Sequence, residues 1–189
     1  MRFPAAPLAF LSIALLAGGA LAADPCVSGL TAGQRPGPYS SIVSVGADRG
    51  ESHCYICDTA DSPAVVVFTR SLTDPLGKLV AALDKAVAGN KAADLRAWVT
   101  FLNTDQSTLD PKVVDWGKKY AIRYVPLGVY ENTDGPPSYR LSGDADVTVL
   151  LFVKRKVVGN FAFREGELTE TRVADILNAL PGILPTEKK

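Results

Sequence analysis

Two strongly apolar runs constrain the fold of this chain more than any other feature of its sequence. Residues 64–68 and 147–153 are rich in β-branched side chains, and neither run contains a charged residue. A strand that is apolar on both of its faces has to be covered on both sides, as the central strands of an α/β sheet are. The two runs therefore predict central strands in a sheet that lies between two outer layers.

Helical patterns alternate with the strand patterns. Asp74 is expected to cap a helix with Pro75 at its first position, and Asp110-Pro111 repeats this device for a helix that runs to about residue 120. Thr169 is expected to cap the last helix. Further strands are expected at residues 41–45, 98–102, 125–130 and 156–163. This order predicts an α/β fold with a central, mainly parallel sheet, a C-terminal antiparallel hairpin and flanking helices.

The first residues have the pattern of an export signal. Arg2 precedes an apolar run at 8–16, and Ala20-Leu21-Ala22 is a small-x-small cleavage site. The run is shorter than the ~20 residues that a membrane span needs. We expect residues 1–22 to be a signal peptide, 23–40 an extended segment rich in Gly and Pro, and 41–185 one domain. The mature protein is expected in the periplasm or outside the cell, without a membrane span, where close cysteines oxidise.

The charge balance bears on the class of partner. Lys and Arg together number 20, as do Asp and Glu, so the formal net charge is zero. A nucleic-acid-binding surface needs a surplus of basic side chains to neutralise phosphates. We therefore do not expect nucleic acid to be a partner of this chain.

Several short motifs follow one another in a fixed order along the chain after the leader. They are Gly29-Leu30 with residues 33–39, the run 64–69, Tyr139-Arg140-Leu141, and the run 147–152 followed by 154–158 and Gly166. In this order they resemble the redoxin branch of the thioredoxin-like superfamily, which includes peroxiredoxin-like and resA-type exported proteins. The resemblance implies a thioredoxin-like three-layer sandwich, and a protein that exchanges thiols and disulfides with a protein partner.

The sequence departs from this family at the positions that carry its chemistry. The family's catalytic cysteines follow the first core strand, where residues 68–75 of this chain contain no cysteine, and the family's cis-proline position matches Val147. The Cys-x-x-Cys motif, Cys54 to Cys57, instead lies before the core strand. No catalytic residue is carried over from the family, and ordinary peroxiredoxin activity is not expected.

Cys54 and Cys57 are the candidate catalytic residues. Two thiols at this spacing can close a small disulfide ring if the chain turns between them. We expect them to be paired, with Cys54 as the attacking thiol because it comes first and lies farther from Asp58 and Asp61, whose carboxylates disfavour a thiolate. The alternative is a non-catalytic binding domain in which a structural disulfide pins the loop before the core strand.

A second constellation consists of Cys26, His53 and the Cys54/Cys57 pair. Three thiolates and one imidazole suit zinc or copper(I), so a metal-binding protein is a further alternative. Against it, Cys26 is distant in sequence and His53 is adjacent to Cys54. A c-type haem needs a histidine directly after the second cysteine, where Asp58 stands, so haem attachment is excluded. We expect no cofactor and assign no residue as a metal ligand. Cys26 is left to pair with either cysteine, with another chain, or with none.

Polar residues mark the carboxyl ends of two expected strands. Arg70, Ser71 and Thr73 stand where the family has its active-site loop, and Asn103 and Asp105 follow the next strand. This is the edge at which open α/β sheets bind ligands. A hydroxyl without an adjacent base is not an activated nucleophile, so we expect a loop and a helix cap here.

Overall fold

The structure, a computed structural model, describes residues 24–185, so the expected signal peptide lies outside the described residues. The strands are β1 (Ser41–Val45), β2 (Ser52–His53), β3 (Ala64–Thr69), β4 (Arg96–Leu102), β5 (Leu127–Tyr130), β6 (Val147–Val153) and β7 (Lys156–Phe163). The α-helices are α1 (Tyr55–Asp58), α2 (Asp74–Gly89), α3 (Gln106–Lys119) and α4 (Glu170–Ala179), and the 3-10 helices are η1 (Lys91–Ala93), η2 (Pro137–Tyr139) and η3 (Leu180–Gly182). Within residues 24–185, every helix falls short of the length and apolar character needed to cross a membrane.

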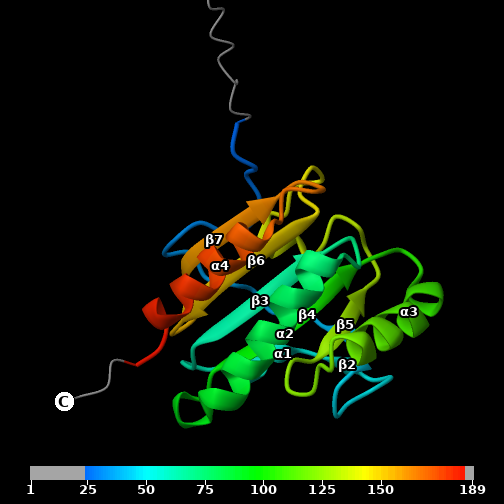
Figure 1. Cartoon of the computed structure of the whole chain (residues 1–189), viewed down its shortest axis with the longest axis horizontal. Coiled ribbons are helices and arrows are strands. Elements are labelled where there is room, and N and C mark those ends of the chain that lie inside the picture. Colours follow the sequence, from blue (N-terminus) through cyan, green and yellow to red (C-terminus); the bar gives the residue numbers. More distant parts are fainter. Residues whose placement is uncertain (1–23, 186–189) are drawn as a thin grey trace, which may run out of the picture.

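The strands form one seven-stranded mixed sheet in the order β2-β1-β5-β4-β3-β6-β7 (Figure 1). The expectation of a mainly parallel sheet is wrong. β3 and β4 pair parallel, as do β4 and β5, whereas the other pairings are antiparallel. Parallel neighbours need a long crossover, which α2 and α3 provide, while β1–β2 and β6–β7 are joined by short turns that make them antiparallel.

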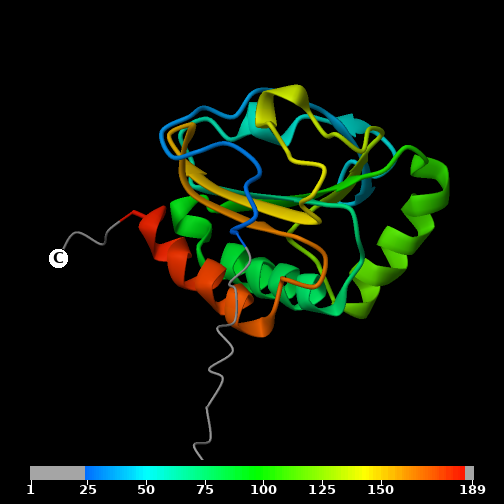
Figure 2. The ribbon, with the colours of Figure 1, turned by 90° about the horizontal axis from the view of Figure 1, so that it is seen from above.

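The two faces of the sheet are covered differently. Helices α2, α3 and α4 lie on one face, whereas α1 and η2 lie on the other (Figure 2). The leading segment, residues 24–40, begins beside α4 at Cys26 and then passes to the face of α1 and η2. Val65 and Val67 of β3 belong to the core cluster under the helices. Val66 and Phe68 belong to the cluster on the opposite face, which we call the helix-free face because, apart from the single turns of α1 and η2, no helix of the described residues covers it. The chain is thus a three-layer α/β sandwich.

The predicted central strands are confirmed by their pairing. Val66 of β3 lies opposite Leu150 of β6, and both side chains are fully buried. On the helical face, Leu79 and Leu83 of α2 pack into the same cluster as Val65. The indole rings of Trp98 and Trp116 are buried as well, on opposite faces of the sheet.

The leading segment is irregular, without a helix or strand over residues 24–40, and follows the end of the sheet. The backbone N–H of Gly33 donates to the carbonyl of Val157 over 2.8 Å, and the N–H of Val157 donates to the carbonyl of Gln34 over 2.9 Å. These bonds attach the segment to β7, the edge strand. The hydroxyl of Tyr139 in η2 donates to the carbonyl of Gly37 over 3.0 Å and holds the next part of the segment.

Two helices begin where threonine side chains accept a backbone N–H. Thr73 caps α2 by accepting from the N–H of Leu76, so the expected cap at Asp74 is wrong by one residue. Thr169 caps α4 by accepting from the N–H of Arg172, as predicted. In both cases the hydroxyl satisfies a donor that the first helical turn leaves unpaired.

The third long helix, α3, begins before the expected Asp110-Pro111 boundary. Asp105 is its cap, and the Asp105 carboxylate accepts from the N–H of Thr108 over 3.0 Å. Hydrogen bonds from the Thr108 and Ser107 hydroxyls also reach this carboxylate and lower its pKa to about 2. Pro111 therefore lies inside the helix, close enough to its start that the missing N–H removes only one early hydrogen bond.

Candidate functional site

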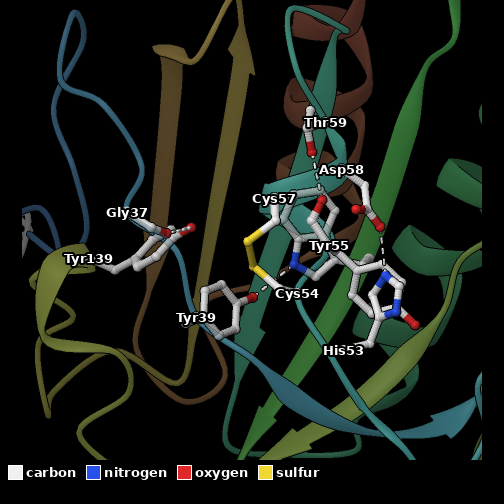
Figure 3. The surroundings of a disulfide bond; sticks show 10 residues. Gly37, Tyr39, His53, Cys54, Tyr55, Cys57, Asp58, Thr59 and Tyr139 are labelled. Carbon is white, nitrogen blue, oxygen red and sulfur yellow. Dashed lines mark hydrogen bonds and ion pairs between the residues drawn. A yellow bond between two sulfur atoms is a disulfide. The ribbon is translucent and has the colours of Figure 1, made fainter.

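The cysteines of the Cys-x-x-Cys motif are joined by a disulfide bond on the helix-free face (Figure 3). Their Cα atoms are 5.3 Å apart. The turn expected between them is the short helix α1, for which Cys54 is the N-terminal cap, and the N–H of Cys57 donates to the carbonyl of Cys54 over 3.0 Å. This helical turn brings the two side chains to one side, which an extended strand would not do.

Contacts outside the disulfide hold α1 in place. Ile56 is 4% exposed and packs into the core cluster of the helix-free face. The hydroxyl of Thr59 donates to the carbonyl of Tyr55 over 2.8 Å, and the Arg96 guanidinium donates to the carbonyl of Asp58 over 2.8 Å. A single helical turn is not stable alone, so these contacts and the disulfide together define its position.

His53 lies between two carboxylates rather than free in a loop. Its Nε2 is 2.8 Å from Oδ2 of Asp58, and its Nδ1 is 3.1 Å from Oδ2 of Asp48. Its ring lies 4.3 Å from the ring of Tyr55, centroid to centroid. Burial, together with the Asp48 and Asp58 carboxylates, raises the pKa of Tyr55 to about 12, so this hydroxyl is neutral. The Asp58 carboxylate faces His53.

The structure does not assemble the four residues of the suggested metal site. Cys26 is unpaired among the described residues and lines a separate groove of about 810 Å³ with Asn160 and Phe161 of β7. Both ring nitrogens of His53 already face carboxylates. Within residues 24–185, no three His, Cys, Asp or Glu side chains gather as a metal ion would need. Burial raises the pKa of the Cys26 thiol, which makes it less reactive.

The two sulfurs of the disulfide have different surroundings. Cys57 is exposed, whereas Cys54 is half-buried and packs against the core cluster of the helix-free face. Beside Cys57 lies a groove of about 250 Å³, which we call the Cys57 groove, lined by Pro36, Pro38, Ile56, Cys57 and Arg155. Arg155 belongs to the tight β6–β7 turn, and its Nε donates to the carbonyl of Ala60 over 3.3 Å.

Comparisons with known proteins agree with this architecture. The chain matches no family model and no curated protein. Solved structures with a similar fold include a secreted thiol-disulfide isomerase from Corynebacterium glutamicum, with a TM-score of 0.58, 13% identity, and coverage of 79% of this chain and 85% of that one. A putative thiol:disulfide interchange protein DsbE from Chlorobium tepidum has a TM-score of 0.56 at 15% identity, covering 80% and 99%. Peroxidoxin BcpB from Mycobacterium tuberculosis has a TM-score of 0.57 at 14% identity, covering 82% and 98%.

The fold is thioredoxin-like. The neighbours include a thiol:disulfide interchange protein, a thiol-disulfide isomerase and a peroxidoxin, so the expected thioredoxin-like fold is confirmed.

In this thioredoxin-like fold, hydrogen bonds fix the loop after β3, which contains Arg70, Ser71 and Thr73 and stands at the family's catalytic position. The Arg70 guanidinium donates to the carbonyls of Ala145 and Thr133. The Ser71 hydroxyl donates to Oδ2 of Asp146 over 2.5 Å, and Thr73 caps α2. The expectation of a loop and a helix cap is confirmed here. On the next strand, Asn103 accepts from the N–H of Asp105 and likewise serves the local backbone.

Sequence reasoning found the cysteines but missed the residues beside them. Pro36, Pro38 and Arg155 join Cys57 in one groove although they come from the leading segment and the β6–β7 turn. The hairpin predicted at residues 147–163 places Arg155 in a turn, which is the one local signal available. Its position over α1 depends on the packing of distant segments.

Proposed function

We propose that this chain is an exported thiol–disulfide oxidoreductase whose Cys54/Cys57 pair exchanges with the thiols or disulfides of partner proteins. The observation that carries the proposal is the disulfide itself, which joins two residues of a thioredoxin-like fold of which one, Cys57, is exposed and lines a groove. A disulfide with an accessible sulfur can exchange with an external thiolate, whereas a buried one cannot.

Two kinds of support come from the similar proteins and from the leader. The Corynebacterium neighbour is named a secreted thiol-disulfide isomerase, and the Chlorobium neighbour a thiol:disulfide interchange protein. The expected signal peptide at residues 1–22 would bring the chain to a compartment in which such exchange occurs. N-terminal sequencing of secreted or periplasmic material tests the export step, with a mature start at Ala23 or Asp24 as the expected result.

A non-catalytic binding domain with a structural disulfide is the second candidate, and specific observations favour it. α1 spans only Tyr55–Asp58, too short to stabilise a thiolate as the long helix of a thioredoxin site does. The carboxylates of Asp48 and Asp58 lie beside the motif. Both features favour the disulfide over the dithiol, which is what a structural staple needs.

The reduction potential of the Cys54/Cys57 pair separates the two candidates. A catalytic pair should equilibrate with a dithiol buffer at roughly −270 to −120 mV, and a structural disulfide should lie below about −300 mV. The protein to use is Cys26→Ser, so that only the pair titrates. We expect the reducing end of the catalytic range, because a helix N-terminus of useful length is lacking.

An assay of disulfide reduction tests the same two candidates. Wild-type protein and Cys26→Ser should accelerate the reduction of a disulfide-bonded protein by excess dithiol, and the double variant Cys54→Ser/Cys57→Ser should not. A wild-type rate equal to that of free dithiol, together with a potential below the catalytic range, would overturn the enzymatic proposal in favour of the binding domain.

A further inference from the structure

We infer that Cys57, and not the first cysteine Cys54, is the sulfur that forms the mixed disulfide with a partner. We further infer that the Cys57 groove receives a partner segment with a carboxylate beside its cysteine. This inference rests on the proposed function and reverses the expectation from sequence order that Cys54 attacks.

Access is the first argument. The rate of thiol–disulfide exchange depends on which sulfur an incoming thiolate can reach. Cys57 is exposed and lines the groove, whereas Cys54 is half-buried against the core cluster that contains Trp98. Figure 3 shows the two sulfurs on one side of α1 and His53 on the other. A partner's thiolate therefore reaches Cys57 first.

The shape of the groove is the second argument. Two prolines of the leading segment, Pro36 and Pro38, form one wall, and their fixed φ makes that wall stiff. Between them, the carbonyl of Gly37 is held by the Tyr139 hydroxyl. Ile56, which packs into the core, lies behind Cys57 and supports the floor of the groove. The stiff wall and the held carbonyl preform the groove, which lowers the ordering cost of binding a short segment.

Charge supplies the preference for an acidic neighbour. Among the described residues that line the groove, Arg155 alone is charged. The carboxylate nearest in sequence to Cys57, that of Asp58, points to His53 instead. A guanidinium at this place favours the thiolate form of Cys57 after reduction, and it offers hydrogen bonds to a carboxylate on the partner.

The exchange balances in electrons and protons. A partner thiolate attacks Sγ of Cys57, the Cys54–Cys57 bond breaks, and its electron pair leaves on Sγ of Cys54, which then takes up a proton. The second thiol of the partner, as thiolate, attacks the partner's own sulfur in the mixed disulfide and releases Cys57 as a thiolate. The partner dithiol is oxidised by two electrons and the protein pair is reduced by two; the reverse sequence reduces a partner disulfide.

Single-cysteine variants test which sulfur reacts. Cys26→Ser/Cys54→Ser and Cys26→Ser/Cys57→Ser, both reduced, are mixed with the disulfide-linked dimer of acetyl-Glu-Cys-amide, and the adduct is followed by mass spectrometry. We expect the variant that keeps Cys57 to form the mixed disulfide faster by about tenfold or more than the variant that keeps Cys54. Equal rates, or a faster reaction of Cys54, would overturn the inference.

The outcomes also separate this inference from the proposed function. If Cys26→Ser protein exchanges with the peptide while Cys54 is the faster single cysteine, only the inference fails. If neither single-cysteine variant forms an adduct and Cys26→Ser does not exchange, the proposed function fails as well. Circular dichroism of each variant confirms that the fold is retained before rates are compared.

Matched peptides test the preference for a carboxylate. The exchange rate of the acetyl-Glu-Cys-amide dimer is divided by that of the acetyl-Gln-Cys-amide dimer, for reduced Cys26→Ser and for the same reduced protein with Arg155→Gln. We expect Arg155→Gln to lower this ratio by up to about fivefold, the equivalent of one exposed ion pair. Arg123→Gln, at an exposed arginine that does not line the groove, is the control and should leave the ratio unchanged. A ratio that is insensitive to Arg155→Gln would overturn this part of the inference.

Discussion

The hydroxyl of Tyr139 donates a hydrogen bond to the carbonyl oxygen of Gly37 over 3.0 Å and so couples the buried aromatic cluster to one wall of the Cys57 groove. The ring of Tyr139 is fully buried and packs edge-on against Phe68 and Tyr39. The position of the two prolines beside Cys57 therefore depends on a residue in the core.

Replacing Tyr139 with Phe should loosen this wall while keeping the core filled. The loss of one hydrogen bond should cost about 0.5–1.5 kcal/mol in the free energy of unfolding by urea. The amides of Gly37 and Tyr39 should exchange their hydrogens faster, because the segment between the prolines loses its anchor. Unchanged exchange at these two amides would show that the segment is held by other contacts.

Leu83→Ala should be strongly destabilising. Leu83 is 1% exposed and lies in the core cluster beneath α2, so its truncation removes apolar contacts and leaves a cavity. We expect a loss of about 2–5 kcal/mol in the free energy of unfolding. Lys85→Ala, an exposed position on the same helix, is the control. A loss below about 1 kcal/mol would mean that α2 packs loosely on the sheet.

The buried carboxylate of Asp84 should hold the loop before β5 by accepting hydrogen bonds from its backbone. Its Oδ1 accepts from the N–H groups of Arg123, Tyr124 and Val125 at 2.9, 2.6 and 2.9 Å. Asp84→Ala leaves these donors unpaired and should cost about 1–3 kcal/mol or more. Asp84→Asn keeps an oxygen at the same place and should recover most of the loss. If both variants unfold at the same urea concentration, the charge rather than the acceptor geometry is what matters.

The cap of α3 should make stability depend on pH in the acid range. Hydrogen bonds lower the pKa of Asp105 from its ordinary value near 3.8 to about 2. A depressed folded-state pKa stabilises the fold above the unfolded value, and that contribution is lost as the pH falls from about 4 through about 2.

Asp105→Asn removes this titration and keeps a capping side chain. Urea midpoints of wild type and Asp105→Asn, measured between neutral pH and pH 2, should therefore converge as the pH falls. A difference between the two proteins that stays constant over this range would contradict the role of the ionised carboxylate.

The sequence predicted those elements whose apolar composition requires burial. β3 and β6 are apolar on both faces and were placed correctly, and the turn and strand at residues 154–163 followed from the same pattern. The start of α3 was missed because Gln106, Ser107 and Thr108 have a loop-like composition. Only the hydrogen bonds that gather on Asp105 make them the first turn of a helix.

At the candidate site, too, the local features were predicted and the long-range contacts were not. The disulfide between Cys54 and Cys57 was expected from their spacing, but α1 between them was expected only as a turn. The contacts that define the groove are long-range: Arg155 bonds to the carbonyl of Ala60, 95 residues earlier. No local sequence pattern encodes such a contact. The charge beside the disulfide and the more accessible of its two cysteines could therefore be identified only from the folded structure.

The disulfide lies before β3 in the chain, whereas the family's catalytic loop lies after β3. The two positions are therefore at opposite ends of this strand. Six residues of strand, Ala64–Thr69, lie between them, a length of about 20 Å. That distance exceeds the ~8 Å over which charges influence one another in physiological salt. A cysteine pair engineered into the loop around Ser71 would therefore titrate independently of Cys54 and Cys57, and the chain is a scaffold with room for a second redox couple on one sheet.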